Sequence, residues 1–146
     1  ELTLSMCGFP GETEIEKTKK ALSVWQAALG DRLKLRTQIL PRSFAPFSDL
    51  NLHCIYWDKH YKPNPTETVM NIGRTVLIAS DKATSIVDSD VIIYATELAK
   101  QKGDDPEFLK KKYKESLYYG LIHEIGHALG LDHPYTPGIK SLYDKY

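Results

Sequence analysis

The sequence predicts a domain of the α+β class, a mixed α/β sandwich in which two helices pack on a five-stranded mixed sheet. Three observations predict this fold. Five short segments are typical of strands, two longer segments repeat apolar residues every three or four positions, and the order is strand, helix, four strands, helix. No repeat, low-complexity tract or linker divides the 146 residues, so we expect a single domain over 1–146.

The first strand and the first helix occupy the beginning of the chain. Alternation of apolar and polar residues predicts a strand over 1–6. Apolar residues at steps of three and four predict a helix over 14–29. Thr13 and Glu16 have the spacing of a capping box, in which each side chain binds a backbone N–H at the start of the helix.

Four more strands are predicted before the second helix. Alternating apolar residues indicate strands over 33–39, just before Pro41, and over 48–57. A short run rich in β-branched residues indicates a strand over 75–79. The strand predicted over 86–95 has a core that is apolar on both faces, which is typical of a strand buried in the middle of a sheet.

The second helix has a clear beginning and a clear end. Asp105 is a typical N-cap residue, proline is favoured at the first helical position, here Pro106, and Glu107 is an acid in the first turn. Gly130 can adopt a positive φ and end the helix. The apolar residues between these ends recur at helical spacing, at Leu109, Tyr113, Leu117, Leu121, Ile125 and Ala128.

The composition excludes several classes of protein. Lys and Arg number 19, as do Asp and Glu, so the formal net charge is zero. A dedicated nucleic-acid binder needs a basic surface, and a disordered chain has a lower apolar content than the 42% found here. No apolar run is long enough to span a membrane. We therefore expect no nucleic-acid partner and no membrane span. We also expect a monomer.

Three histidines at the end of the second helix have the spacing of a zinc site. His123 and His127 are four residues apart, so their rings leave the same helix face. Gly130 can turn the chain back so that His133 reaches the same ion. Three protein ligands leave one position of a tetrahedral Zn²⁺ open, which is typical of catalytic zinc. Glu124 is offset from the ligands, and this placement suits a base that acts on water.

The alternative interpretation of these residues is a helix with surface histidines and a capping glycine. It requires the full spacing to arise by chance, which in a chain of this composition has a probability on the order of 10⁻⁵.

The eleven residues His123–His133 match the pattern H-E-x-x-H-x-x-G-x-x-H of the metzincin zinc endopeptidases. Within that clan the motif most resembles the matrixins, and a weaker resemblance extends over most of the chain. It implies a metzincin-like catalytic domain with a twisted five-stranded mixed sheet, a backing helix that contains Val24 and Trp25, and an active-site helix. It also implies one catalytic Zn²⁺ and a peptide or protein substrate.

In matrixins the strand before the last one forms the upper rim of the cleft and pairs with the substrate backbone. The resemblance gives this role to the segment from Gly73 to Ala79, to which a substrate would add as a further strand. The alternative is an ordinary edge strand. The residues implied in substrate binding are Arg74, Thr75, Val76, Leu77, Ile78 and Ala79.

The chain departs from the clan after His133, where a methionine-containing turn is expected. The only methionines are Met6 and Met70. Three alternatives remain for this region. Tyr or Leu takes the Met position in a turn over 141–143, the turn is deleted and 138–143 form the terminal helix, or a loop with the turn is missing from the chain.

A second departure concerns auxiliary metal ions. Matrixins usually carry a structural zinc held by further His and Asp residues, but His53 and His60 do not lie in such a cluster, so we expect no structural zinc. Calcium is an alternative at three aspartates, although no EF-hand-like spacing surrounds them. These are Asp81, Asp88 and Asp90.

Cys7 and Cys54 leave several alternatives open. They could form a disulfide or remain two buried thiols. The segment Cys7-Gly8-Phe9-Pro10 also resembles the latency switch of matrixin propeptides, but it follows the first strand instead of preceding it. Because an even number of cysteines suits an oxidising compartment, we expect a secreted or periplasmic protein.

The expected function is that of a zinc-dependent endopeptidase that cleaves extended peptides with a metal-activated water, with Glu124 as general base. One alternative is a zinc-bound but inactive module that binds peptides on its edge strand. Another is an enzyme that is latent or acts only on its own chain. A run of lysines on the second helix is expected to lie on a solvated face, at Lys110, Lys111, Lys112 and Lys114.

Overall fold

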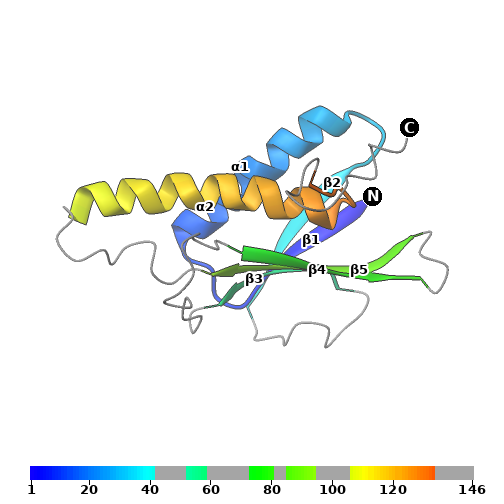
Figure 1. Cartoon of the computed structure of the whole chain (residues 1–146), viewed down its shortest axis with the longest axis horizontal. Helices are drawn as coiled ribbons and strands as arrows, with labels where there is room; N and C mark the ends of the chain where they lie inside the picture. Colours follow the sequence, from blue (N-terminus) through cyan, green and yellow to red (C-terminus); the bar gives the residue numbers. More distant parts are fainter. Residues whose placement is uncertain (42–51, 59–72, 81–84, 95–105, 134–146) are drawn as a thin grey trace, which may run out of the picture.

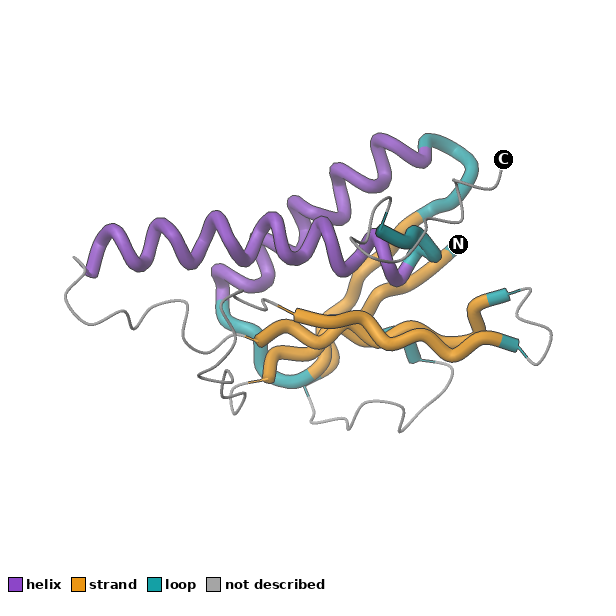
Figure 2. The backbone as a smooth tube through the Cα atoms, viewed as in Figure 1, coloured by secondary structure: helices purple, strands orange, loops and turns teal. Residues whose placement is uncertain are grey.

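The computed structural model of the chain describes residues 1–41, 52–58, 73–80, 85–94 and 106–133. The elements follow the predicted order: β1 (Leu2–Cys7), α1 (Glu12–Leu29), β2 (Leu35–Leu40), β3 (Cys54–Asp58), β4 (Gly73–Ala79), β5 (Ile86–Tyr94) and α2 (Pro106–Ala128). Both helices lie on the same side of the sheet (Figures 1 and 2). The predicted α+β class, with a five-stranded mixed sheet and two helices, is confirmed.

The sheet is parallel except at one edge. Its strand order is β2-β1-β3-β5-β4, and β4 is the one strand that runs antiparallel to its neighbour. In the register of this pair, Thr75 lies opposite Val91. Among the described residues β4 pairs only with β5, so the strand predicted over 75–79 does lie at an edge.

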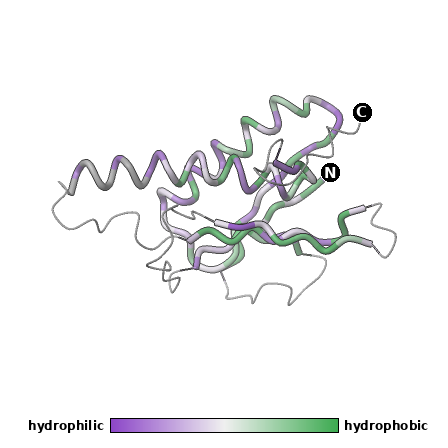
Figure 3. Tube along the Cα trace, viewed as in Figure 1, coloured by the Kyte–Doolittle hydropathy of each residue, from purple (hydrophilic) through white to green (hydrophobic). Residues whose placement is uncertain are grey.

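The hydrophobic core lies between the helices and the sheet face that they cover. Hydrophilic and hydrophobic residues alternate along α1 and along the second half of α2, as expected when one helix face is buried (Figure 3). The predicted apolar positions of α2 from Leu117 onward are buried, whereas the side chains of Leu109 and Tyr113 lie outside the described ones. The core residues are Leu4, Ala21, Leu22, Ile55, Val91, Ile93, Leu117, Leu121, Ile125 and Ala128.

The beginning of α1 differs from the prediction. The helix begins at Glu12, and the N-cap residue is Gly11, whose extended backbone carries no side-chain cap. Thr13 is therefore already the second helical residue, and the predicted capping box with Glu16 is wrong. Glu12 and Glu14 place acidic charge in the first turn instead, where it interacts favourably with the helix dipole.

Strand boundaries also differ from the prediction. β1 spans Leu2–Cys7 instead of 1–6, β2 spans Leu35–Leu40 instead of 33–39, and β4 begins at Gly73 instead of residue 75. β3 begins at Cys54, because Leu52 and His53 are not in strand conformation, and residues 48–51 lie outside the described part of the chain. β5 ends at Tyr94, and Ala95 lies outside the described residues.

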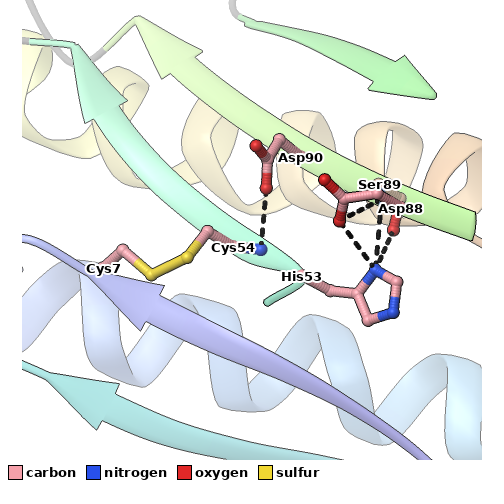
Figure 4. Close-up of polar contacts among 6 residues, drawn as sticks. All are labelled: Cys7, His53, Cys54, Asp88, Ser89 and Asp90. Atoms are coloured by element: carbon pink, nitrogen blue, oxygen red, sulfur yellow. Dashed lines mark hydrogen bonds and ion pairs between the residues drawn. A yellow bond between two sulfur atoms is a disulfide. The ribbon is translucent and has the colours of Figure 1, made fainter. Parts of the chain in front are cut away.

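The sheet face opposite the helices carries a disulfide. Cys7 on β1 and Cys54 on β3 are joined, with their Cα atoms 5.8 Å apart (Figure 4). Of the alternatives for these cysteines, the structure therefore has the disulfide. A disulfide-bonded sulfur is not a thiolate, so Cys7 cannot act as a latency switch in this state.

Two predicted calcium ligands lie buried on β5, near this disulfide (Figure 4). Asp88 Oδ1 accepts the Ser89 N–H at 2.9 Å and lies 3.3 Å from His53 Nδ1. Asp90 Oδ1 accepts the N–H of Cys54 at 3.0 Å. The Asp90 contact joins β5 to β3, and the Asp88 contact with His53 joins β5 to the residue that precedes β3. Neither aspartate belongs to a group of three metal-ligand side chains among the described residues. Asp81 lies outside them.

Among the described residues, no helix combines the length and the apolar character needed to cross a membrane.

Candidate metal centre

Three histidine rings converge at the C-terminal end of α2. The Nε2 atom of His127 lies 3.1 Å from that of His123 and 3.2 Å from that of His133, and the third separation is 2.9 Å. A tetrahedral zinc ion with bonds of about 2.0–2.1 Å holds its ligand nitrogens about 3.3 Å apart. A small outward adjustment of the rings therefore fits such an ion. In the described part of the chain, these histidines are the one group of three or more His, Cys, Asp or Glu side chains whose ligand atoms lie close enough together to hold a metal ion.

Gly130 explains how His133 returns to the end of the helix. Its φ is +89°, a backbone conformation that favours glycine. The Gly130 N–H donates to the carbonyl of His127 at 2.8 Å, and the Leu131 N–H donates to the carbonyl of Gly126 at 3.0 Å. This pair of hydrogen bonds is a Schellman motif, which satisfies the last helix carbonyls and reverses the chain. The predicted turn at Gly130 is confirmed.

The ring of His127 is oriented by the same turn. Its Nδ1 lies 2.7 Å from the main-chain oxygen of Leu131. Because a carbonyl oxygen only accepts hydrogen bonds, Nδ1 carries the proton in this contact, and Nε2 of the neutral ring presents a lone pair to the other two histidines. Contacts of this kind fix the tautomer of metal-binding histidines.

The electrostatic environment of His123 favours its neutral form. Burial lowers the pKa of His123, the nearby Glu124 carboxylate raises it, and the neighbouring His127 and His133 lower it, with a net lowering. A metal ion binds the neutral imidazole, so a lowered pKa keeps this ring ready for a metal at neutral pH.

Glu124 lies between α2 and the edge strand. It is only 7% exposed. Its Oε2 accepts a hydrogen bond of 2.7 Å from the Thr75 hydroxyl, which also lies 2.8 Å from the Glu124 main-chain oxygen. At Gly73, two residues earlier on the same strand, a Cβ would lie 3.3 Å from Cγ of Glu124 and 2.7 Å from the carbonyl oxygen of Ile92. The absence of a side chain at Gly73 therefore lets β4 approach the glutamate.

The six residues predicted to bind substrate all lie on β4. Arg74, Leu77 and Ala79 are exposed, and the others are half-buried. A role for them in substrate binding stays a prediction. Thr75 has a contact that the sequence did not reveal, because its partner Glu124 is 49 residues away and no local pattern marks such a pair.

A recess of about 380 Å³ lies beside the histidines, between α1 and α2. Trp25 forms part of its wall and donates a hydrogen bond from Nε1 to the carbonyl of Ile122 at 2.8 Å. Tyr119 and Leu131 contribute further apolar surface. The Trp25 ring packs directly on Gly126, where a Cβ would lie 2.9 Å from Cζ2. These contacts join the backing helix to the histidine-bearing turn of α2.

The lysine run lies farther along α2. Lys111 is exposed and Lys114 is half-buried, whereas the side chains of Lys110 and Lys112 lie outside the described ones. The two described lysines share a surface depression with acidic residues of the same helix, Glu107 and Glu115.

The predicted methionine position after His133 falls within residues 134–146, which lie outside the described part of the chain.

Comparisons with protein-family models, curated proteins and solved structures found no match to this chain.

Proposed function

We propose that this chain is a zinc-dependent endopeptidase, a single metalloprotease catalytic domain over 1–146 that is similar to the matrixin branch of the metzincins. The observation that carries the proposal is the convergence of three histidine Nε2 atoms within 3.2 Å of one another, next to a glutamate in the same helix turn. The three histidines fit a single ion with an open position.

His123, His127 and His133 would hold the zinc. When bound, zinc supplies a Lewis acid that polarises a peptide carbonyl and lowers the pKa of water toward neutrality. Glu124 takes a proton from the attacking water and later donates it to the leaving amine. Its low exposure favours this role, because few water molecules compete for the carboxylate.

The edge strand supplies the second part of the proposal, an extended peptide as substrate. β4 offers main-chain groups along its outer edge, since it pairs with β5 alone among the described strands. A peptide adding to this edge would form main-chain hydrogen bonds along Gly73–Ala79. The contact between Thr75 and Glu124 brings this edge next to the proposed base.

The Cys7–Cys54 disulfide supports placing the protein in an oxidising compartment, secreted or periplasmic.

The test combines zinc analysis with peptide cleavage. We expect the wild-type protein to bind one zinc per chain and to cleave members of a peptide library, with the activity removed by a chelator and restored by zinc. The variant Glu124→Gln keeps the size of the side chain but cannot accept the proton. We expect it to bind zinc and to lose activity by a factor of about 10²–10⁴.

Glu115→Gln is the matched control, because Glu115 is an exposed glutamate on the same helix, two turns before the histidines. We expect its activity to equal that of the wild type. Zinc binding without any cleavage would favour the alternative of an inactive peptide-binding module. Full activity of Glu124→Gln would show that Glu124 is not the base, and failure to bind zinc would refute the metal site itself.

A further inference from the structure

We propose that Thr75 is a positioning residue, whose hydroxyl holds one carboxylate oxygen of Glu124 so that the other oxygen faces the reacting water. This inference rests on the proposed function. It changes the role implied for Thr75 by the resemblance, because the side chain would act through Glu124 and would not contact the substrate.

The direction of the hydrogen bond follows from the two acceptors that surround the hydroxyl. Oγ1 of Thr75 lies 2.7 Å from Oε2 of Glu124 and 2.8 Å from the main-chain oxygen of the same residue. A carbonyl inside a helix already accepts the N–H four residues later. An ionised carboxylate is also the stronger acceptor. The hydroxyl proton therefore points to Oε2, while the contact with the main-chain oxygen keeps the hydroxyl close to α2.

Burial makes this hydrogen bond important. Glu124 is 7% exposed, and a buried carboxylate is costly unless hydrogen bonds replace the lost water. Within the described part of the chain, Thr75 is the side chain that hydrogen-bonds to this carboxylate. With Oε2 held in this way, Oε1 is the oxygen left to accept a proton from water.

The backbone of β4 fits the same arrangement. Gly73 and Thr75 are two residues apart, so they lie on the same face of the strand. The missing side chain at Gly73 gives room to Cγ of Glu124, and the hydroxyl of Thr75 fixes the end of that side chain. The edge strand thus has two separate tasks, because its main chain would pair with the substrate while these two positions hold the base.

The two possible roles of Thr75 predict different kinetic effects. A positioning residue affects the chemical step, so its loss lowers kcat and leaves KM nearly unchanged. A residue that binds substrate mainly through its side chain gives a higher KM with kcat retained.

The experiment compares Thr75→Val, which removes the hydroxyl at nearly constant volume, with Thr75→Ser, which keeps it. We expect Thr75→Val to lower kcat about tenfold with KM within about twofold of the wild type, and Thr75→Ser to restore kcat to within about threefold. Thr37→Val is the matched control, since Thr37 is a half-buried threonine on β2, at the opposite edge, whose hydroxyl has no partner among the described residues. Its kinetics should match the wild type.

A second measurement does not depend on activity. In zinc-loaded protein with ¹³C-labelled glutamate, we expect the carboxylate resonance of Glu124, assigned by its loss in Glu124→Gln, to shift in Thr75→Val and to stay in place in Thr75→Ser and Thr37→Val. If Thr75→Val does not fold, Thr75→Ala serves as a second variant without the hydroxyl.

The outcomes separate this inference from the proposed function. A wild-type protein that cleaves no peptide refutes the proposed function, whereas the carboxylate resonance still tests the contact. Wild-type kcat together with an unshifted resonance in the hydroxyl-free variants overturns the positioning role, and so does a raised KM at unchanged kcat.

Discussion

Replacing Gly130 by alanine tests whether the turn after α2 positions His133. The chain contains a matched control, because Gly8 has the same φ of +89°. A Cβ at Gly8 would meet no atom of the described residues within 4 Å, whereas a Cβ at Gly130 would lie 3.2 Å from Cδ1 of Ile86. Gly8→Ala therefore changes only the backbone preference, far from the histidines in the sequence.

The expected loss of stability follows from these two observations. A residue with a side chain in left-handed backbone conformation costs about 1–2 kcal/mol. The lower conformational entropy of the unfolded alanine variant offsets about 0.4–1 kcal/mol of this loss of stability. We therefore expect Gly8→Ala to lower the unfolding free energy of the metal-free protein by about 1 kcal/mol, and Gly130→Ala to lower it by less, because part of its strain can relax when no metal holds His133. The contact with Ile86 adds less than a core clash would, because Ile86 is 37% exposed and its tip can move.

The two variants should differ in zinc affinity. Without metal, the turn in Gly130→Ala can relax by moving His133 away from the other two rings. Zinc binding has to reverse this relaxation, so the strain that had relaxed, at most about 1 kcal/mol, appears as a weaker zinc affinity of up to about fivefold, since about 1.4 kcal/mol corresponds to tenfold. In Gly8→Ala the strain is the same with and without zinc, and the affinity should not change.

Stability is measured by urea unfolding in chelator, followed by tryptophan fluorescence, and zinc affinity by competition with a chromophoric chelator. If Gly130→Ala is destabilised but binds zinc as tightly as the wild type, the turn does not control His133. Equal weakening of zinc binding in both variants would also refute the reasoning, because the substitution at Gly8, far from the histidines in the sequence, would then affect zinc affinity as much as the one at Gly130.

Three further predictions follow. Gly126→Ala should lower the unfolding free energy by about 1–3 kcal/mol in calorimetry, because the new Cβ would lie 2.9 Å from the Trp25 ring; an unchanged melting temperature would contradict this packing. The double variant Cys7→Ala/Cys54→Ala should have an unfolding free energy lower by about 2–4 kcal/mol in urea unfolding, since the disulfide closes a separation of 47 residues. A reductant should lower the stability of the wild type only. The pKa of His123 is lowered in the native state, so the unfolded state takes up a proton first, and the metal-free protein should lose stability as pH falls below about 6.5. A His123→Asn variant should lose less stability over the same pH range. An equal loss of stability in the variant and the wild type would show that His123 is not the group responsible.

The parts of the fold that follow from local sequence were predictable. The elements and their order follow from apolar periodicity, and both ends of α2 carry clear signals in Pro106 and Gly130. The three histidines could be identified because a helix and one turn determine their separation. The start of α1 was predicted wrongly. Gly11 and Thr13 are both possible N-cap residues and lie only two positions apart, and in the structure the N-cap is Gly11.

Contacts between distant segments were not predictable from patterns of this kind. The pairing of Thr75 with Glu124 depends on which strand lies at the sheet edge, and propensity does not determine strand order. Asp88 could equally have been a surface residue, because nothing beside it in the sequence indicates that it is fully buried and contacts His53. Whether Cys7 and Cys54 come together also depends on β1 and β3 being neighbours.

The spacing of the site residues along the chain has a consequence for how the site forms. All three proposed ligands come from eleven consecutive residues, so the ability to bind a metal ion is a property of one helix end. The setting of Glu124 instead requires a contact that spans 49 residues. A partly unfolded chain, or an isolated peptide of this helix end, could therefore capture an ion before the sheet forms. Reactivity would appear only when β4 docks, which separates loading of the ion from the onset of peptide cleavage.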